Sequence, residues 1–324
     1  MILLITDSSS RHADQLEIGL TKIEAEFRRI DTDQLLSSTF FEHVSINNRP
    51  KSSIYISNIE VPLSDVGVIW WFNYQAPVTA LSAEKPWIRN WIENESEIAF
   101  RSILYSLDVQ IVNHPLTVLS ANNKMVQYRL ADRLGFYVPD TIISSSKKRI
   151  VRFLSNHKSC IFKTLSHPTR EDADQESVIY TSRVVPDHVE ASDNLEVCPN
   201  LFQEEILKQY ELRVTVVATE VFAVRIYSQL SPATSIDWRR YDIPNTPHEW
   251  VQLPEQVENA CRELTSQLGL YYSTIDLIVD HENRYWFIEL NPNGLWLWLE
   301  MLTGVPVSVS LARYLFNVDV GKID

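Results

Sequence analysis

Three side chains with oxygen donors lie close together near the C-terminal end of the sequence. Asp276 falls in an apolar run from Thr274 to Val279, and Glu289 falls in a second run from Tyr285 to Leu290. Asn291 follows Glu289 by two residues, so the two side chains would share one face of a strand. Two carboxylates and an amide oxygen are hard ligands of the kind that bind Mg²⁺ together with phosphates. We therefore predict a metal site at Asp276, Glu289 and Asn291.

The polar segment from His281 to Arg284 separates the two runs and predicts a β-hairpin. A four-residue turn would place Asp280 opposite Tyr285, and therefore Asp276 opposite Glu289. A three-residue turn would make the two carboxylates diagonal instead. Taken alone, each carboxylate is more simply interpreted as a solvated residue at a strand end. Burial of both in apolar strands without a cation would cost several kcal/mol, which favours metal binding.

Two lysines occupy positions that favour contact with an anion. Lys124 follows the polar segment from Ser120 to Asn123, just before a predicted helix from Met125 to Leu134. At a helix N-terminus the dipole disfavours a cation unless an anion faces it. Lys163 lies inside the apolar strand from Cys160 to Leu165, where an unpaired ammonium is costly. The alternative for each lysine is a surface side chain whose ammonium reaches water.

Three arginines are candidates for binding an acidic group. The segment from Glu211 to Val217 alternates with Arg213 pointing inward, and we expect Arg225, in the partner strand from Val221 to Tyr227, to point to the same side. Arg239 lies in the irregular loop Asp237-Trp238-Arg239, where charged and aromatic residues are functional candidates. The planar guanidinium suits both carboxylates and phosphates. The alternative for Arg239 is a salt bridge within the loop.

Composition limits the classes of partner. The chain has 324 residues, of which 45% are hydrophobic and 22% charged, as in an ordinary globular protein. Acidic residues outnumber basic ones by 42 to 29, for a net charge of −13. This balance argues against non-specific binding of nucleic acid and permits a basic peptide as partner.

The sequence also bears on the compartment. Cys160, Cys198 and Cys261 are far apart and odd in number, so neither a disulfide framework nor a zinc pattern follows, and we expect a reducing cytoplasm. The segment MILLITDSSS has no basic leader and reads as a first strand rather than a signal peptide. No apolar run approaches the length of about 18 residues that a membrane span needs, so we expect no membrane partner.

Periodicity predicts three domains. Residues 1–115 are expected to form an open parallel sheet, with strands at Ile2 to Thr6, Val66 to Phe72 and Val109 to Val112, and helices at Asp14 to Arg28 and Lys85 to Leu107. Residues 116–204 are expected to form a central domain, in which the polar segment 165–177 is a hairpin tip. Residues 205–324 are expected to form the last domain, with helices at Glu255 to Leu268 and Val307 to Phe316.

The order of these motifs resembles the ATP-grasp ligase superfamily: NNK, a helix, G-x-x-V-P-x-T, Lys163 in a strand, FQEEI, ELR, and the set Asp276, Glu289 and Asn291. The segments ELRVTVV, DWR and ELNPNGLWLWLE are similar to those of graspetide synthetases, which make microviridin-type peptides. The resemblance covers residues 110–304 well and the first domain only in outline. It implies a mixed α/β and α+β fold, with an N-terminal parallel-sheet domain, a central lid and a C-terminal antiparallel sheet.

The resemblance also implies roles for individual residues. Lys124 and Lys163 would neutralise ATP phosphates, and Asp276, Glu289 and Asn291 would bind Mg²⁺. The strand from Gln203 to Ile206 would contact adenine, with Glu204 near its amino group. The remaining nucleotide-binding candidates are Glu205, Ile206 and Glu211, the last of which would hold the ribose. With Gly only 7 and no G-x-x-x-x-G-K, a Walker loop is excluded. The resemblance implies instead that the tip from Ser166 to Gln175 would close over the phosphates.

In that family a carboxylate is activated as an acyl phosphate, and a hydroxyl or an amine then attacks it to give an ester or an amide. Arg213 would hold the acyl phosphate and Arg239 would receive an acidic substrate side chain. The substrate would be a ribosomal precursor peptide whose Asp or Glu side chains are joined to Thr, Ser or Lys. Its leader segment would dock on the central domain, where Glu190, Asp193 and Glu196 are candidates. The resemblance also suggests a homodimer.

Two departures and two alternatives remain. The segment Trp70-Trp71-Phe72-Asn73-Tyr74 is apolar and neutral where the family has basic residues, and Arg225 replaces a small residue, so that it either alters the acyl-phosphate pocket or pairs with a carboxylate. A RimK-like ligase, which joins an amino acid to a protein or small acid, would share every ATP residue. The other alternative is a nucleotide-binding module without catalysis, against which the intact metal and lysine positions argue.

Overall fold

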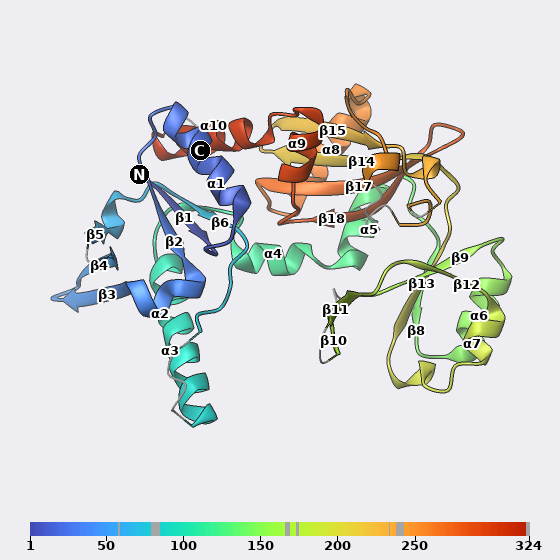
Figure 1. The fold of residues 1–324 in the computed structure, drawn as a ribbon, viewed down its shortest axis with the longest axis horizontal. Coiled ribbons are helices and arrows are strands. Elements are labelled where there is room, and N and C mark those ends of the chain that lie inside the picture. The colour runs from blue at the N-terminus through green and yellow to red at the C-terminus, as the bar shows by residue number, and fades with distance from the viewer. Residues whose placement is uncertain are drawn as a thin grey trace.

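The computed structural model describes residues 1–57, 59–78, 85–165, 169–172, 175–232, 234–237 and 243–321, apart from the side chains of Ser38 and of residues 169–172 and 175–178. Three groups of elements follow one another along this part of the chain (Figure 1). The N-terminal elements lie at the left of the view, the C-terminal sheet at the upper right and the central domain, here called the lid, at the lower right. Parallel and antiparallel sheets with helices confirm the predicted mixed α/β and α+β class.

The N-terminal group contains the predicted parallel sheet, with strand order β2-β1-β6-β7. Its elements are β1 (Ile2–Thr6), α1 (Arg11–Lys22), β2 (Phe27–Asp31), β6 (Val68–Trp71), α3 (Pro86–Tyr105) and β7 (Gln110–Val112). A second, antiparallel sheet contains β3 (Thr39–Ile46), β4 (Arg49–Ile56) and β5 (Ile59–Pro62), preceded by the short α2 (Leu35–Ser38).

The first helix is shorter than the sequence predicts. It ends at Lys22 instead of Arg28, because Glu24 adopts φ 56°, a left-handed conformation through which a right-handed helix cannot continue. Phe27, predicted as helical, therefore begins β2.

The lid is an antiparallel sheet with strand order β12-β9-β13-β8. Its elements are β8 (Thr141–Ser144), α6 (Lys147–Ser155), β9 (Cys160–Lys163), β12 (Ser182–Val184), α7 (Pro186–Glu190) and β13 (Asn200–Glu204). A separate hairpin of β10 (Thr169–Asp172) and β11 (Gln175–Val178) follows β9, in agreement with the predicted hairpin tip. Residues 166–168 and 173–174 of that tip lie outside the described part of the chain.

The C-terminal group is built on an antiparallel sheet with strand order β16-β15-β14-β17-β18. The strands are β14 (Lys208–Val217), β15 (Glu220–Ile226), β16 (His248–Val251), β17 (Tyr272–Asp280) and β18 (Tyr285–Asn291), and the helices are α8 (Glu255–Gln267), α9 (Leu297–Thr303) and α10 (Val307–Asp319). The predicted hairpin is β17–β18. Helices α4 (Pro115–Ala121) and α5 (Lys124–Arg133) connect the first domain to the lid.

The two faces of the C-terminal sheet have different neighbours. Alternate side chains of β14, such as Leu212 and Val214, form a core with α5 and α8. On the other face, Val217 and Tyr272 join a core with Trp296, with α10 and with the N-terminal sheet. That second face also carries Arg213 and Asp276. Apolar packing on both faces holds the sheet in place and thereby positions these two polar side chains. No helix in the described residues is long and apolar enough to cross a bilayer.

The turn of the β17–β18 hairpin is held by one buried carboxylate, that of Asp280. Its Oδ1 accepts from the backbone N–H groups of Glu282 and Arg284, both at 2.9 Å, and its Oδ2 accepts from Arg284 Nε at 2.7 Å and Trp286 Nε1 at 2.8 Å. Burial alone would raise the pKa of Asp280, but these hydrogen bonds outweigh it and lower the pKa to about 2. The ionised carboxylate therefore stabilises the fold above the unfolded pKa of about 4, and this contribution is lost as the pH falls to about 2.

We predict that Asp280→Ala lowers the free energy of unfolding at pH 7 by about 1–3 kcal/mol, because buried donors lose their acceptor. Urea denaturation at pH 7 and pH 3 measures the difference from the unaltered protein, which should be smaller at pH 3. Glu282→Ala is the matched control, since the Glu282 side chain is 71% exposed. Equal losses in the two variants would contradict the assignment.

Candidate active site

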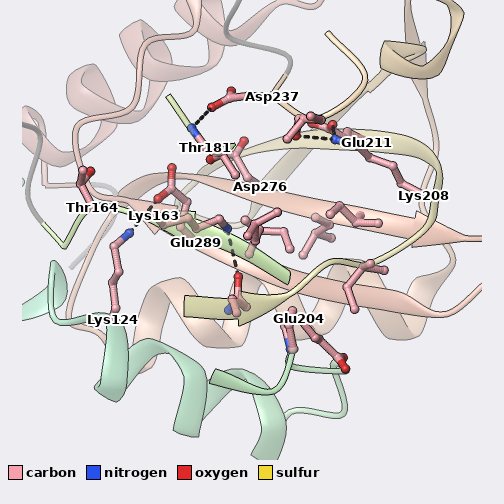
Figure 2. A pocket seen from close by; sticks show the side chains of 18 of the residues that line it. Lys124, Lys163, Thr164, Thr181, Glu204, Lys208, Glu211, Asp237, Asp276 and Glu289 are labelled. Atoms are coloured by element: carbon pink, nitrogen blue, oxygen red, sulfur yellow. Dashed lines mark hydrogen bonds and ion pairs between the residues drawn. The ribbon is translucent and has the colours of Figure 1, made fainter. Parts of the chain in front are cut away.

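A cleft lies between the lid and the C-terminal sheet (Figure 2). Most of the residues predicted to bind nucleotide or metal line it: Lys124, Lys163, Gln203, Glu204, Ile206, Glu211, Asp276 and Glu289. The lining also includes polar residues that the sequence analysis did not single out, namely Thr164, Thr181 and Lys208.

Asp276 and Glu289 are direct partners in the β17–β18 ladder, as predicted. The predicted register of the turn is wrong, however, because Tyr285 pairs with Val279 and not with Asp280. A one-residue shift between the turn and Asp276 restores the predicted pairing.

The shift is a β-bulge in β18. Phe287 and Leu290 both belong to the apolar core, whereas the two residues between them, Ile288 and Glu289, both line the cleft. In a regular strand Glu289 would share the face of Phe287. The extra residue thus lets β18 keep its apolar side chains in the core and still present Glu289 to Asp276.

Arg213 neutralises Asp276 from the neighbouring strand. The two residues are register partners on β14 and β17, and Arg213 Nη1 donates to both carboxylate oxygens of Asp276, at 2.9 and 2.8 Å. Both residues are buried, with 7% and 9% of their surface exposed. Burial raises the pKa of Asp276, the charge of Arg213 opposes that rise, and the charge of Glu289 adds to it.

Lys124 neutralises Glu289 from the opposite side. Its ammonium donates to Glu289 Oε2 at 2.8 Å. The lysine is the first residue of α5, whose N-cap Asn123 accepts from the N–H groups of Met125 and Val126. Asn291 also lies beside the pair, with its Nδ2 3.3 Å from Glu289 Oε1. The two neighbouring carboxylates are therefore flanked by a cation on each side, Arg213 beside Asp276 and Lys124 beside Glu289.

The second predicted lysine reaches the cleft from the lid. Lys163 Nζ donates to Gln203 Oε1 at 3.1 Å, across the paired strands β9 and β13. Gln203 Nε2 donates in turn to Thr141 Oγ1 at 2.9 Å. Lys163 thus lies on the lid side of the cleft and Lys124 on the sheet side (Figure 2).

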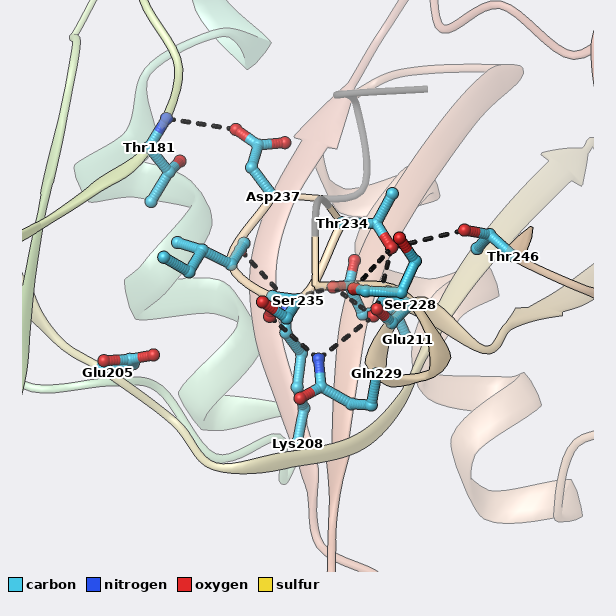
Figure 3. Close-up of polar contacts among 12 residues, drawn as sticks. Thr181, Glu205, Lys208, Glu211, Ser228, Gln229, Thr234, Ser235, Asp237 and Thr246 are labelled. Carbon is cyan, nitrogen blue, oxygen red and sulfur yellow. Dashed lines mark hydrogen bonds and ion pairs between the residues drawn. The ribbon is translucent and has the colours of Figure 1, made fainter. Parts of the chain in front are cut away.

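A polar cluster closes the end of the cleft around Glu211 (Figure 3). Glu211 accepts from Lys208 and, at 3.0 Å, from Ser228 Oγ. Lys208 also donates to the carbonyl of Ile236 at 3.0 Å, which ties the following loop to the sheet. Asp237 in that loop accepts from the N–H of Thr181 at 3.1 Å, so the loop joins the C-terminal sheet to the lid.

Solved structures of RiPP-associated ligases and macrocyclases are similar to this chain over nearly its whole length. A RiPP-associated ATP-grasp ligase from Chryseobacterium gregarium aligns with 100% of this chain and 97% of its own length, at 26% identity and a TM-score of 0.91. The macrocyclase MdnC from Microcystis aeruginosa, also 26% identical, aligns with 98% of this chain and 99% of its own, at a TM-score of 0.85. These neighbours support an ATP-grasp ligase of the graspetide-synthetase type. No protein-family model and no curated protein matches the sequence.

The strand predicted to contact adenine presents Glu204 and Glu205 differently. Glu204 lines the cleft beside His157 and Asp140, and His157 Nε2 lies 3.0 Å from Asp140 Oδ2. The hydrogen bond with Asp140 raises the pKa of His157, whose Nδ1 faces the carbonyl of Phe153. Glu205 is not part of the described lining. Its carboxylate accepts from Ser159 and from Arg183.

The predicted orientation of Arg225 is wrong. Arg225 pairs with Leu212 on β14, whereas Arg213 pairs with Val224, so the two arginines project from opposite faces of the sheet. Arg225 lies over the ring of Tyr210 and 3.6 Å from Glu249. Of the two alternatives for this residue, the structure thus shows pairing with a carboxylate outside the cleft.

Two further predictions concern Arg239 and three acidic residues of the lid. Arg239 falls in residues 238–242, outside the described part of the chain, whereas Asp237 of the same motif is described and buried. The acidic candidates for leader binding are all exposed on the lid, at Glu190, Asp193 and Glu196.

Other contacts show what the sequence analysis missed. Lys208 and Glu211 are three residues apart and would face opposite sides of a regular strand, but an irregularity between Lys208 and Tyr210 brings them together. No pattern in the sequence marks that irregularity. Gln127, whose side chain hydrogen-bonds both backbone groups of Leu290, was also missed. Its place near the site could have been predicted, because residues three apart on a helix share a face and Gln127 follows Lys124 by three.

We predict that Arg213→Met lowers the free energy of unfolding by about 3–5 kcal/mol, since it leaves Asp276 buried without its counter-charge. Urea denaturation of the ligand-free protein measures this loss. Arg262→Met serves as control. The Arg262 side chain is about one third exposed, so its contacts with Glu258, Asn259 and the carbonyl of Thr219 compete with water, and the loss should be clearly smaller than for Arg213→Met. A similar small effect of both substitutions would show that Arg213 is not the counter-charge.

Proposed function

We propose that this protein is an ATP- and Mg²⁺-dependent ligase that activates Asp or Glu side chains of a ribosomal precursor peptide and joins them to Thr or Ser hydroxyls or Lys amines. The carboxylate pair of Asp276 and Glu289 carries the proposal, because both side chains line the cleft between lid and sheet. Arg213 and Lys124 flank the pair with positive charge. The Chryseobacterium ligase is described in complex with ADP and a leader and core peptide, and MdnC is bound with the precursor peptide MdnA.

The metal-binding residues of the proposed enzyme are Asp276, Glu289 and Asn291. The two carboxylates face each other, and the amide of Asn291 lies within 3.5 Å of both. A half-turn of that amide would present Oδ1 instead of Nδ2, so that all three side chains would offer oxygen. This donor set fits Mg²⁺, which when bound would neutralise charge on the phosphates of the nucleotide.

The nucleotide would lie along the cleft. Lys124 and Lys163, on opposite walls, would bind phosphates as point charges. Glu211 would accept from the ribose hydroxyls, with its position held by Lys208 and Ser228. Glu204 and the backbone of Glu205 and Ile206 would face the base, together with Gln203. The side chain of Glu205 would position the strand through Arg183 and Ser159.

The reaction requires a cationic environment for the acyl phosphate. The substrate carboxylate attacks the γ-phosphorus of ATP, ADP leaves, and a hydroxyl or amine then displaces phosphate from the acyl group. Arg213 is the proposed stabiliser of that anion from beneath Asp276, and Arg239 the proposed receptor of an acidic substrate side chain. Arg225, on the other face of the sheet, takes no part.

The leader segment of the peptide would dock on the lid, where Glu190, Asp193 and Glu196 would receive a basic residue. We further propose a homodimer in the cytoplasm. In support of a reducing compartment, Cys160, Cys198 and Cys261 are all free thiols.

The test is the intact mass of a candidate precursor peptide, rich in Thr and acidic residues, after incubation with the protein, ATP and Mg²⁺. We expect a loss of one water, about 18 Da, for each ring, and no loss with Glu289→Ala or Asn291→Ala, which remove metal ligands. Methanolysis of the product then distinguishes esters from amides. An unchanged peptide mass together with ATP turnover on free amino acids would overturn the proposal in favour of a RimK-like amino-acid ligase.

A further inference from the structure

The metal-bearing strand β18 is the last strand of its sheet, so its outer backbone groups have no neighbouring strand. Near the turn those groups pair with the backbone of Tyr137, which donates to the carbonyl of Tyr285 at 2.9 Å and accepts from the N–H of Phe287 at 2.8 Å. Beyond the bulge the partner is a side chain. Gln127 Oε1 accepts from the N–H of Leu290 at 3.0 Å, and Gln127 Nε2 donates to the carbonyl of Leu290 at 2.9 Å.

Every polar group of the Gln127 amide is used. Nε2 makes a second hydrogen bond, to the carbonyl of Ala121 at 2.7 Å, and the residue is 1% exposed. The orientation of the amide is fixed by chemistry, because two carbonyls can face only the nitrogen and the N–H of Leu290 can face only the oxygen. The side chain therefore replaces one residue of a missing strand.

The residue that Gln127 holds lies between two proposed metal ligands. Leu290 separates Glu289 from Asn291 in the sequence, and its own side chain is in the core. A shift of the bulge by one residue would turn Glu289 toward the core and Leu290 toward the cleft. The hydrogen bonds from Gln127 to both backbone groups of Leu290 oppose that shift, which would remove Glu289 from the metal site.

Helix α5 thus contacts this strand in two ways. Lys124 binds the carboxylate of Glu289, and Gln127, one turn later, binds the backbone of Leu290. We propose that Gln127 is a positioning residue for the metal site: it holds β18 in the bulged register that presents Glu289 and Asn291 to the cleft. The inference rests on the proposed role of these two residues as metal ligands.

The test compares Gln127→Met, which keeps the length of the side chain but removes its hydrogen bonds, with Gln267→Met, an exposed glutamine on α8. Mn²⁺ binding in the presence of ADP is measured by electron paramagnetic resonance, and exchange of the Leu290 amide hydrogen is measured by NMR. We expect Gln127→Met to weaken Mn²⁺ binding by about tenfold or more, as for other residues that orient metal ligands. Exchange at Leu290 should also become at least about tenfold faster, and the control should change neither quantity.

The outcomes separate this inference from the proposed function. Equal Mn²⁺ affinity in Gln127→Met and in the unaltered protein would overturn the positioning role alone. Absence of Mn²⁺ binding by the unaltered protein would overturn the metal site, and with it this inference. If Gln127→Met does not fold, Gln127→Glu is tested instead. Glutamate keeps the acceptor for the N–H of Leu290, but it places an oxygen in place of the nitrogen that donates to the carbonyls of Ala121 and Leu290. The same loss of Mn²⁺ affinity is then expected, and an unchanged affinity again overturns the role.

Discussion

The constraint on which the site depends is the position of two carboxylates, the buried Asp276 and the half-buried Glu289, directly opposite each other on adjacent strands. Asp276 and Glu289 would repel each other in the cleft wall if no cation lay beside them. Arg213 supplies one positive charge from β14 and Lys124 the other from the start of α5. The central strand, the edge strand and a connecting helix must therefore meet at one place, and the rest of the fold holds them there.

The sheet satisfies this constraint because its two faces have different roles. One face of β14 and β17 packs on α5 and α8, while the other carries the polar row at the cleft and an apolar core at its far end. The bulge in β18 reconciles the edge strand with this division, since Phe287 and Leu290 stay in the core while Glu289 reaches the cleft. The cluster of Lys208, Glu211 and Asp237 links the same sheet to the lid, so nucleotide-binding residues from both domains share one framework.

The sequence predicted the hairpin and its carboxylate pair because alternation and spacing are local properties. The predicted turn was wrong by one residue, and the bulge in β18 compensated for that error. The pairing of Asp276 with Glu289 was therefore correct, but the alternation of side chains does not predict the bulge on which it depends. The same limitation explains Arg225: in the hairpin of β14 and β15 odd-numbered residues pair with even-numbered ones, which places Arg213 and Arg225 on opposite faces. The contacts of Gln127 with Leu290 and of Asp237 with Thr181 join distant segments and depend on tertiary structure.

The most direct measurement of the central claim is a crystal structure of the protein with ADP and Mn²⁺, with the metal located by its anomalous scattering. The account predicts a peak within about 2.4 Å of carboxylate oxygens of both Asp276 and Glu289 and of the amide oxygen of Asn291, a distance that allows for hard-cation coordination. A metal bound to the nucleotide but distant from both carboxylates would contradict the claim that Asp276 and Glu289 form the metal site.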